Sequence, residues 1–153
     1  MPDALRPTAP TLAALEADPR VVWNEDVLRF SDTDQNGHVN NATFAVFCES
    51  GRVNLLHHRL KPTRPGDAYF VLARVVIDFK AELHYPGRVR IATWVPRIGR
   101  TSVAFGQALF GPDGRLAATA EAVTVSMDGR TRRPLPLADE TRAAVEAVLR
   151  PEA

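Results

Sequence analysis

The sequence predicts one α+β domain in which a long helix packs on an antiparallel sheet. Apolar residues recur with a spacing close to 3.6 over residues 40–56, which is typical of a helix with one buried face. From residue 71 to residue 127 the spacing changes to 2, the period of a strand. Short turns rich in Gly, Pro and Asp separate these later segments, and such short connections require antiparallel neighbours.

The first twenty residues are expected to form an extension that precedes the domain. They are rich in Pro and Ala, with room for one or two helical turns over residues 11–17 before Asp18-Pro19 stops them. The segment VVWNEDVLRF, residues 21–30, then provides the first strand. The domain itself is assigned to residues 21–153.

One face of the helix at residues 40–56 is expected to be buried. Its residues are Phe44, Phe47, Cys48, Gly51 and Leu55. A glycine costs about 1 kcal/mol in a helix interior. Gly51 on the buried face therefore indicates that the helix lies close to the sheet.

The ends of this helix carry the residues that helix ends favour. Asn40 or Asn41 is a suitable N-cap. Cations cluster at the C-terminal end, where they suit the helix dipole, and Pro62 prevents continuation. On a second face, Glu49 and Arg52 are three residues apart and are expected to pair. The C-terminal cations are His57, His58, Arg59 and Lys61.

Four further strands and a short helix follow. The strands are expected at residues 71–79, 88–95, 103–109 and 116–127. In the last of these, Val123, Val125 and Met127 continue the alternation of Leu116, Ala118 and Ala120 one position out of phase, which predicts a β-bulge near Ala122. A helix over residues 138–149, capped by Asp139, ends the domain.

The strand at residues 71–79 is apolar on both of its faces. One long helix cannot cover both faces of a five-stranded sheet, so this strand needs burial that a single chain does not supply. We therefore expect a homo-oligomer, either a dimer or a tetramer.

The composition argues against several classes of protein. The chain has 19 Lys and Arg against 18 Asp and Glu, a balance that disfavours nucleic-acid binding through a broad basic face. The single cysteine excludes an intrachain disulfide framework and a multi-cysteine metal site. No apolar run is long enough to span a membrane and the N-terminus does not resemble a secretory signal, so a cytoplasmic location is expected.

Polar chemistry is concentrated in SDTDQNGHVNN, residues 31–41, between the first strand and the helix. Turn and cap chemistry would explain each residue singly, but as a set they indicate a site. Asp32, Asp34, Asn36 and Gly37 also fit the first positions of an EF-hand calcium loop. That match fails at Thr43, where a bidentate Glu is required, and no helix precedes the segment.

Other kinds of site are disfavoured as well. His38 with the two aspartates lacks a third convincing His or Cys, so no metal site is predicted. Cys48 lies within the apolar helix face and is expected to be a core residue rather than a nucleophile. No Gly-x-Ser-x-Gly turn offers a serine nucleophile.

The segment SDTDQNGHVNNATFAVFCESGR resembles the hotdog-fold thioesterases of the 4-hydroxybenzoyl-CoA thioesterase type. The resemblance runs in order and length from about Val21 to Val148. It implies a hotdog fold, in which a five- or six-stranded antiparallel sheet wraps a long central helix, with active sites between subunits. The matching features are an aromatic strand end at Phe30, Asp-x-Asp at residues 32–34, Gly-His-Val-Asn-Asn at residues 37–41, Phe44, and Glu-x-x-Arg at residues 49–52.

The resemblance also implies roles for individual residues. Asp34 would face the thioester carbonyl as nucleophile or general base, and the backbone N–H near Asn41 would polarise the carbonyl oxygen. Asn36 and His38 match positions that the acyl-carrier-protein branch of the family uses. Other members have a catalytic His where this chain has Asn41, so it stays open whether His38 takes part or braces the turn. Asp32 is assigned to the turn.

Two further groups are implied as substrate-binding residues. Phe44 would line the acyl pocket. The turn at residues 96–102 corresponds to the family's contact with the nucleotide phosphates of CoA, which suits arginine chemistry. A solvated hairpin tip is the alternative interpretation of this turn. The implied phosphate-binding residues are Arg97, Arg100, Thr101 and Ser102.

The expected function is hydrolysis of an acyl-CoA thioester to a carboxylic acid and free CoA. CoA would be part of the substrate and product, and no bound cofactor is expected. Two alternatives stay open: an enzyme that acts on acyl groups carried by acyl carrier protein, and a non-catalytic module that binds acyl-CoA.

Overall fold

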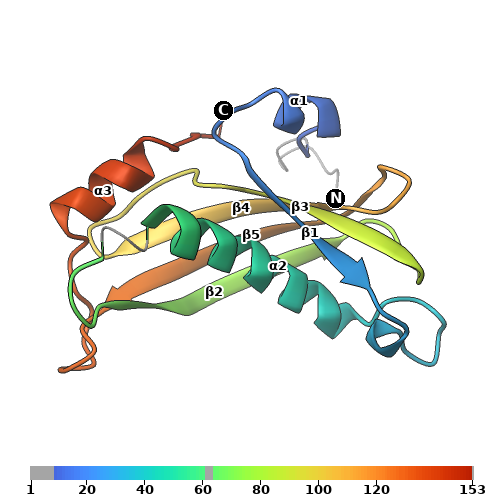
Figure 1. The fold of residues 1–153 in the computed structure, drawn as a ribbon, viewed down its shortest axis with the longest axis horizontal. Coiled ribbons are helices and arrows are strands. Elements are labelled where there is room, and N and C mark those ends of the chain that lie inside the picture. Colours follow the sequence, from blue (N-terminus) through green and yellow to red (C-terminus); the bar gives the residue numbers. More distant parts are fainter. Residues whose placement is uncertain (1–8, 61–63, 153) are drawn as a thin grey trace, which may run out of the picture.

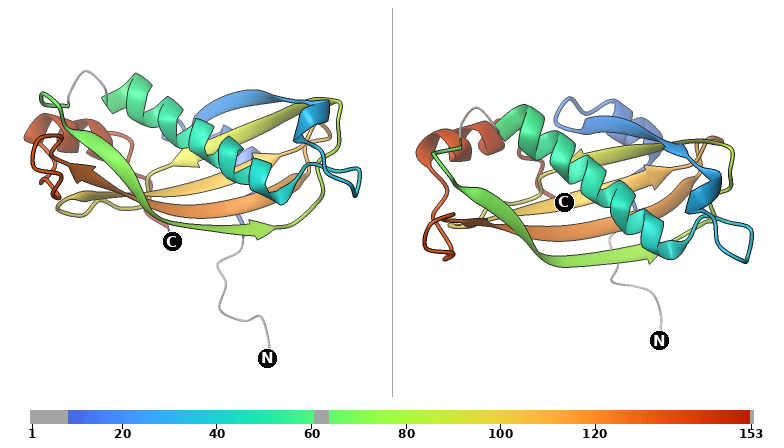
Figure 2. Two further views of the ribbon diagram at one scale, coloured as in Figure 1. Left: turned by 90° about the horizontal axis from the view of Figure 1, so that it is seen from below. Right: turned by 60° about the horizontal axis from the view of Figure 1, so that its bottom comes forward.

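A computed structural model describes residues 9–60 and 64–152. Its five strands form one antiparallel sheet in the order β1-β3-β4-β5-β2. The long helix lies across one face of this sheet (Figures 1 and 2). The expected α+β arrangement is therefore confirmed. The strands are β1 (Val22–Leu28), β2 (Tyr69–Phe79), β3 (Gly87–Trp94), β4 (Ser102–Phe110) and β5 (Leu116–Met127).

The helices agree with the sequence in number and differ at their ends. The long helix α2 (Asn41–Leu55) begins at the expected place and continues without a break into a π-helical segment, η2 (Leu56–Leu60). The terminal helix α3 (Asp139–Glu146) is shorter than expected, and its N-cap is Ala138, so Asp139 is instead the first helical residue. A short helix α1 (Leu12–Glu16) precedes the sheet, and a 3₁₀ turn η1 (Phe30–Asp32) follows β1. Lys61 and Pro62 lie outside the described residues.

The buried face of α2 is the one that the sequence predicts. Phe44, Phe47 and Cys48 pack with residues of β1, β3, β4 and β5 in one apolar cluster, and Leu55 belongs to a second. Gly51 is confirmed as a point of close approach. A Cβ there would lie 2.5 Å from atoms of both Gln107 and Thr93, so only glycine lets the helix sit at this depth.

Arg52 does not lie where the sequence predicts. We expected it to pair with Glu49 on a second face of the helix, but its side chain is 5% exposed and donates to Gln107 Oε1 at 3.2 Å. Gln107 Nε2 in turn donates to the carbonyl of Cys48 and to Thr93 Oγ1. Burial lowers the pKa of the Arg52 guanidinium. The helix is thus joined to the sheet by a polar network as well as by apolar packing.

The expected bulge near Ala122 is wrong. From Ala118 to Ser126 the residues of β5 on the helix side keep one phase, and the register shift near Ala122 lies on the partner strand, between Leu72 and Arg74 of β2. A second register shift lies opposite the start of β5, between Leu109 and Phe110 of β4. The error arose because small residues of β5 face α2, while the large apolar ones lie on the other face. The helix-side residues are Ala118, Ala120, Ala122, Thr124 and Ser126.

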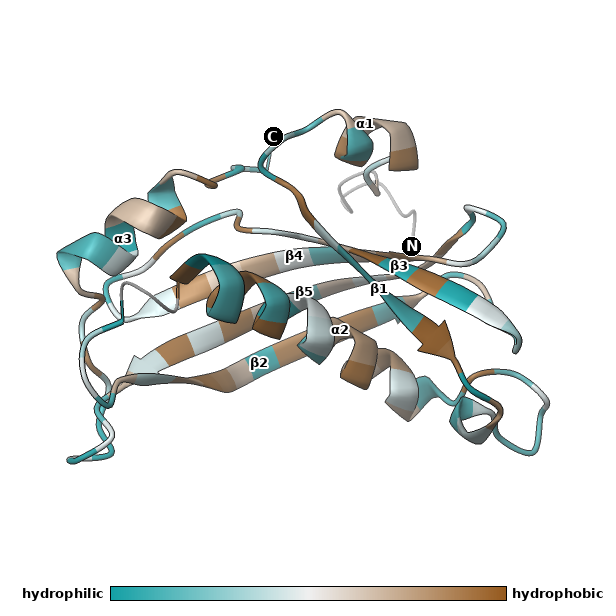
Figure 3. Ribbon diagram, in the orientation of Figure 1, coloured by the Kyte–Doolittle hydropathy of each residue, from teal (hydrophilic) through white to brown (hydrophobic). Residues whose placement is uncertain are grey.

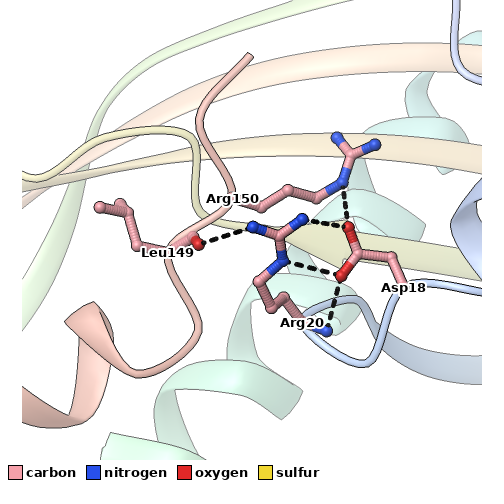
Figure 4. A network of polar contacts seen from close by, with 4 residues as sticks. All are labelled: Asp18, Arg20, Leu149 and Arg150. Atoms are coloured by element: carbon pink, nitrogen blue, oxygen red, sulfur yellow. Dashed lines mark hydrogen bonds and ion pairs between the residues drawn. The ribbon is translucent and has the colours of Figure 1, made fainter. Parts of the chain in front are cut away.

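A polar network beside the sheet joins residues 18–20, which precede β1, to residues 149–150, which follow α3 (Figure 4). Asp18 accepts from Arg20 Nε and Nη2, each at 2.8 Å, and from Arg150 Nε at 2.8 Å. These bonds hold the pKa of the Asp18 carboxyl well below its usual range, with the Arg20 side chain as the largest cause. Leu15 of α1 packs with Trp94 and Phe110 on the sheet face away from α2. The domain boundary at residue 20 stays a prediction.

The edge strand β2 leaves apolar side chains uncovered. Figure 3 colours most of β2 as hydrophobic, and four of its side chains are between 38% and 52% exposed: Leu72, Val75, Val76 and Phe79. None of the helices in the described part of the chain is long and apolar enough to cross a membrane.

Candidate active site

Residues 33–39 form a closed turn that carries Asp34. Thr33 and Val39 pair as an isolated antiparallel bridge. Inside it, Asp34 N–H donates to the carbonyl of His38 and Gly37 N–H donates to the carbonyl of Asp34, both at 3.0 Å. Gly37 has a φ of +80°, a conformation that favours glycine. The sequence NG therefore closes the turn, and the turn fixes the backbone of Asp34.

Asp32 belongs to the frame of this turn. Its carboxylate accepts from the backbone N–H of Arg29 at 2.8 Å, and its carbonyl accepts from Asn40 N–H at 2.8 Å. The carboxylate of Asp34 accepts fewer hydrogen bonds than its two oxygens could. Oδ1 accepts from Asn36 N–H at 2.9 Å, and Oδ2 has no hydrogen-bond partner among residues 9–60 and 64–152. One oxygen of the half-buried Asp34 is thus available for chemistry.

The helix that follows presents a free donor. Asn40 is the N-cap, and its Oδ1 accepts from Ala42 N–H at 2.9 Å. Thr43 N–H donates to the carbonyl of Asn40 at 2.9 Å. The N–H of Asn41 is the first of the helix and so has no acceptor within it, nor does any other described residue accept from it. A carbonyl oxygen that develops negative charge is stabilised by such a donor at the positive end of a helix.

His38 lies in the same turn and points to a second segment. Its Nδ1 is 3.2 Å from the carbonyl of Val39, and its Nε2 is 3.8 Å from Glu82 Oε1. Glu82 also contacts His84, whose other ring nitrogen is 3.3 Å from the carbonyl of Gly37. The sequence analysis missed Glu82 and His84, because they lie about 45 residues beyond the turn and only the fold brings them to it. The side chain of Asn36 is exposed at the tip of the turn.

Phe44 is a core residue in the single chain. It is 3% exposed and packs edge-to-face on Phe79, with 5.1 Å between ring centres. Phe79 is 52% exposed, so the aromatic surface that one chain presents at this point belongs to Phe79. Cys48 is also buried, and burial raises the pKa of its thiol to about 11. This agrees with a core role and disfavours a thiolate nucleophile.

The turn with the two arginines is fixed through its backbone. Thr101 O accepts from Ser126 N–H at 2.7 Å, and Arg100 O accepts from Leu137 N–H at 3.0 Å. The carbonyl of Ser102 accepts from Gly99 N–H at 2.8 Å. The side chains of Arg97 and Arg100 are exposed, and in the described part of the chain neither guanidinium has an ion pair or hydrogen bond. Both cations are therefore available to a ligand.

The structure does not bring Asp34 and the two arginines together in one chain. The Asp34 turn precedes the N-terminal end of α2, whereas the arginine turn lies beside α3 and the far end of η2 (Figures 1 and 2). From Asn41 to Leu60 the helical segment is about 30 Å long at 1.5 Å per residue. Of the residues that the sequence predicts, Asp34, Asn36, His38 and Asn41 form one group, and Arg97 to Ser102 form another.

No metal centre is formed by the acidic and imidazole groups that the structure describes. Among those residues, no three His, Cys, Asp or Glu side chains are arranged to hold a metal ion. A groove of about 670 Å³ lies on the sheet face away from α2, between β2, β5 and the chain ends. None of the candidate site residues lines it.

Comparison with known proteins decides the family. The sequence pattern of the thioesterase-like superfamily matches residues 28–145, a range that contains both groups of site residues. The chain belongs to this superfamily. Its fold is the hotdog fold of the 4-hydroxybenzoyl-CoA thioesterase type, and it is a thioester hydrolase.

Individual relatives are distant and cover most of the chain. YneP of Bacillus subtilis is 27% identical over 111 residues, which are 71% of this chain and 80% of YneP. The acyl-CoA thioester hydrolase YbgC of Escherichia coli is 24% identical over 108 residues, 69% of this chain and 81% of YbgC. A Thermus thermophilus thioesterase, solved with coenzyme A and Zn, is 29% identical with a TM-score of 0.74, covering 87% of this chain and 97% of that one.

Proposed function

We propose that this thioester hydrolase cleaves acyl-CoA to a carboxylic acid and free CoA. Two unpartnered groups carry the proposal. One is a carboxylate oxygen of Asp34, and the other is the N–H of Asn41 at the start of α2. A relative supports the CoA carrier, since YbgC is an acyl-CoA thioester hydrolase. CoA enters as part of the substrate and leaves as product, so no bound cofactor is proposed.

In the proposed reaction, Asp34 activates water or attacks the thioester itself. As general base, its carboxylate takes a proton from water while the water oxygen bonds to the carbonyl carbon. The carbonyl oxygen becomes negatively charged and is stabilised by the Asn41 N–H. The C–S bond then breaks, and the CoA thiolate takes up the proton that Asp34 accepted. As nucleophile, Asp34 would displace the thiolate to give an anhydride, which water then hydrolyses.

His38 and Asn36 are assigned supporting roles in this scheme. Both belong to the turn that carries Asp34, and His38 contacts Val39 and Glu82 rather than the Asp34 carboxylate. Thus the contacts of His38 favour bracing of the turn over a proton transfer of its own.

The phosphates of CoA are proposed to bind Arg97 and Arg100 of a second chain, with Thr101 and Ser102 beside them. The two groups of site residues lie at opposite ends of α2, so one chain does not offer both to one substrate. The exposed apolar edge of β2 supports association of two chains. Phe79 and the buried Phe44 beneath it would then form part of the acyl pocket. A dimer or a tetramer fits this proposal, and a cytoplasmic location stays a prediction.

An acyl carrier protein would present the same thioester on the same pantetheine arm. It would have less need of a cation pair for the nucleotide phosphates. The two exposed guanidinium groups therefore favour CoA.

The proposal is tested by a panel of acyl-CoA substrates of different chain length and aromatic character, with detection of the free thiol. Turnover of at least one acyl-CoA with a kcat/KM well above that of the matching acyl carrier protein is expected. Hydrolysis of the carrier-protein substrate alone would contradict the choice of CoA. Light scattering at micromolar concentration should give at least two chains, and a monomer would contradict the shared site.

A further inference from the structure

The connection between β2 and β3 touches the turn that carries Asp34. Leu83 in this connection is 2% exposed and belongs to the same apolar cluster as Val39. Its carbonyl accepts from Val39 N–H at 2.8 Å. The side chain and the backbone of Leu83 thus anchor the connection against the end of the turn. Its two sequence neighbours, Glu82 and His84, extend this contact toward the tip.

Glu82 and His84 contact each other, and together they contact two residues of the turn, Gly37 and His38. His84 Nδ1 is 3.3 Å from the carbonyl of Gly37, and His84 Nε2 is 3.1 Å from Glu82 Oε2. The other oxygen of Glu82 is 3.8 Å from His38 Nε2. A carbonyl oxygen only accepts, so Nδ1 of His84 donates to Gly37. The other ring nitrogen, Nε2, faces the Glu82 carboxylate, so the imidazole links Glu82 to the backbone of Gly37.

The turn needs such a support from outside. Within it, Asp34 is held by two backbone hydrogen bonds, one to His38 and one from Gly37. The residues at its tip, Gln35, Asn36 and Gly37, are exposed. A displacement of Gly37 or His38 would therefore move Asp34 as well. Misplacement of a reacting group by about 1 Å can lower a rate by about 10²-fold.

We propose that Glu82 and His84 are positioning residues for the hydrolysis, which they serve by holding the turn that carries Asp34. The proposal rests on the role proposed above for Asp34. His84 contacts Gly37 and Glu82 contacts His38, while the Asp34 carboxylate is bonded only to Asn36 N–H among the described residues. Their loss should therefore lower kcat, because Asp34 is oriented less often for reaction, and leave the KM for acyl-CoA nearly unchanged.

The kinetic test compares four variants. Glu82→Ala and His84→Ala should each lower kcat by about 10-fold, with KM changed by less than about twofold. His84→Asn should retain more activity than His84→Ala, since an asparagine amide can still donate to the carbonyl of Gly37. Glu25→Gln is the matched control. It removes another half-exposed carboxylate, 3.8 Å from Arg88 and 3.9 Å from Arg90, at a distance from the turn.

A second measurement does not depend on turnover. In NMR hydrogen exchange, the backbone amides of Asp34 and Gly37 should exchange about tenfold faster in Glu82→Ala and His84→Ala than in the wild type and in Glu25→Gln. If the wild type hydrolyses no acyl-CoA, the proposed function fails. The exchange rates still test whether Glu82 and His84 hold the turn that carries Asp34. Exchange at the control rate would overturn the proposal, and so would faster exchange with an unchanged kcat or a loss confined to KM.

Discussion

The regions near the two ends of the long helical segment differ in which polar groups stay unpaired and can bind a ligand. At the N-terminal end, hydrogen bonds fix the backbone of the Asp34 turn, and a carboxylate oxygen and an N–H stay unpaired. At the other end, the backbone of the turn at residues 96–102 is fixed as firmly, and two guanidinium groups stay unpaired in the described chain. One end offers groups suited to the thioester and the other offers cations suited to phosphate. This distance is the reason for our proposal that each chain supplies half of two sites.

The largest effect is expected from Asp34→Asn, which alters only the first end. The substitution keeps the size of the side chain and removes the charge needed to attack or to accept a proton. Because general-base catalysis contributes about 10²–10⁴-fold, kcat for the best acyl-CoA should fall by at least about 10²-fold. CoA binding, measured by calorimetry, and the thermal midpoint should change little. Retention of more than about a tenth of kcat would contradict the mechanism.

A smaller effect is expected at the second end. Replacing Arg97 and Arg100 together with Ala should raise the KM for acyl-CoA about tenfold, the equivalent of one charge-assisted hydrogen bond, and alter kcat less. Phosphate contacts are similar in the ground state and the transition state, which is why the loss appears in KM. The effect should shrink for a substrate truncated to the pantetheine arm. An equal loss on both substrates would assign these arginines to the fold or to the interface.

The smallest effect is expected away from both ends, at Asp18. Its pKa is held below the usual value by Arg20, so its contribution to stability is complete above the ordinary aspartate pKa and is lost as pH falls through the lowered one. Asp18→Asn should therefore lower the thermal midpoint at pH 7, and the difference from wild type should shrink below about pH 4. Steady-state kinetics should show kcat and KM unchanged. A difference in midpoint that does not depend on pH would contradict the role of the Asp18 charge.

The sequence predicts most of the fold where apolar residues mark the core. The buried face of α2 is such a case, since Phe44, Phe47 and Leu55 are large and apolar. The prediction fails where the residues that face the core are small or polar. The helix side of β5 is built from Ala, Thr and Ser, which misplaced the bulge. The sequence offered Glu49 as the partner of Arg52, because the observed partner, Gln107, is 55 residues away along the chain.

The candidate site shows the same division between local and distant information. The turn of Asp34 and the cap at Asn40 could be predicted because their partners lie within about ten residues. Glu82 and His84 could not, since only the pairing of β2 and β3 with the rest of the sheet carries them to Gly37 and His38. The separation of Asp34 from Arg97 likewise depends on the direction of α2 across the sheet.

Mixing of two defective chains tests the shared site most directly. Asp34→Asn chains and chains with both Arg97→Ala and Arg100→Ala are co-expressed in equal amounts with different tags, so that mixed oligomers form. In a mixed dimer one site receives both defects and the other receives none. The account predicts that activity at low acyl-CoA concentration returns to about a quarter of the wild-type value, since half of the dimers are mixed and one site in each is intact. Activity no higher than the mean of the two separate variants would contradict it.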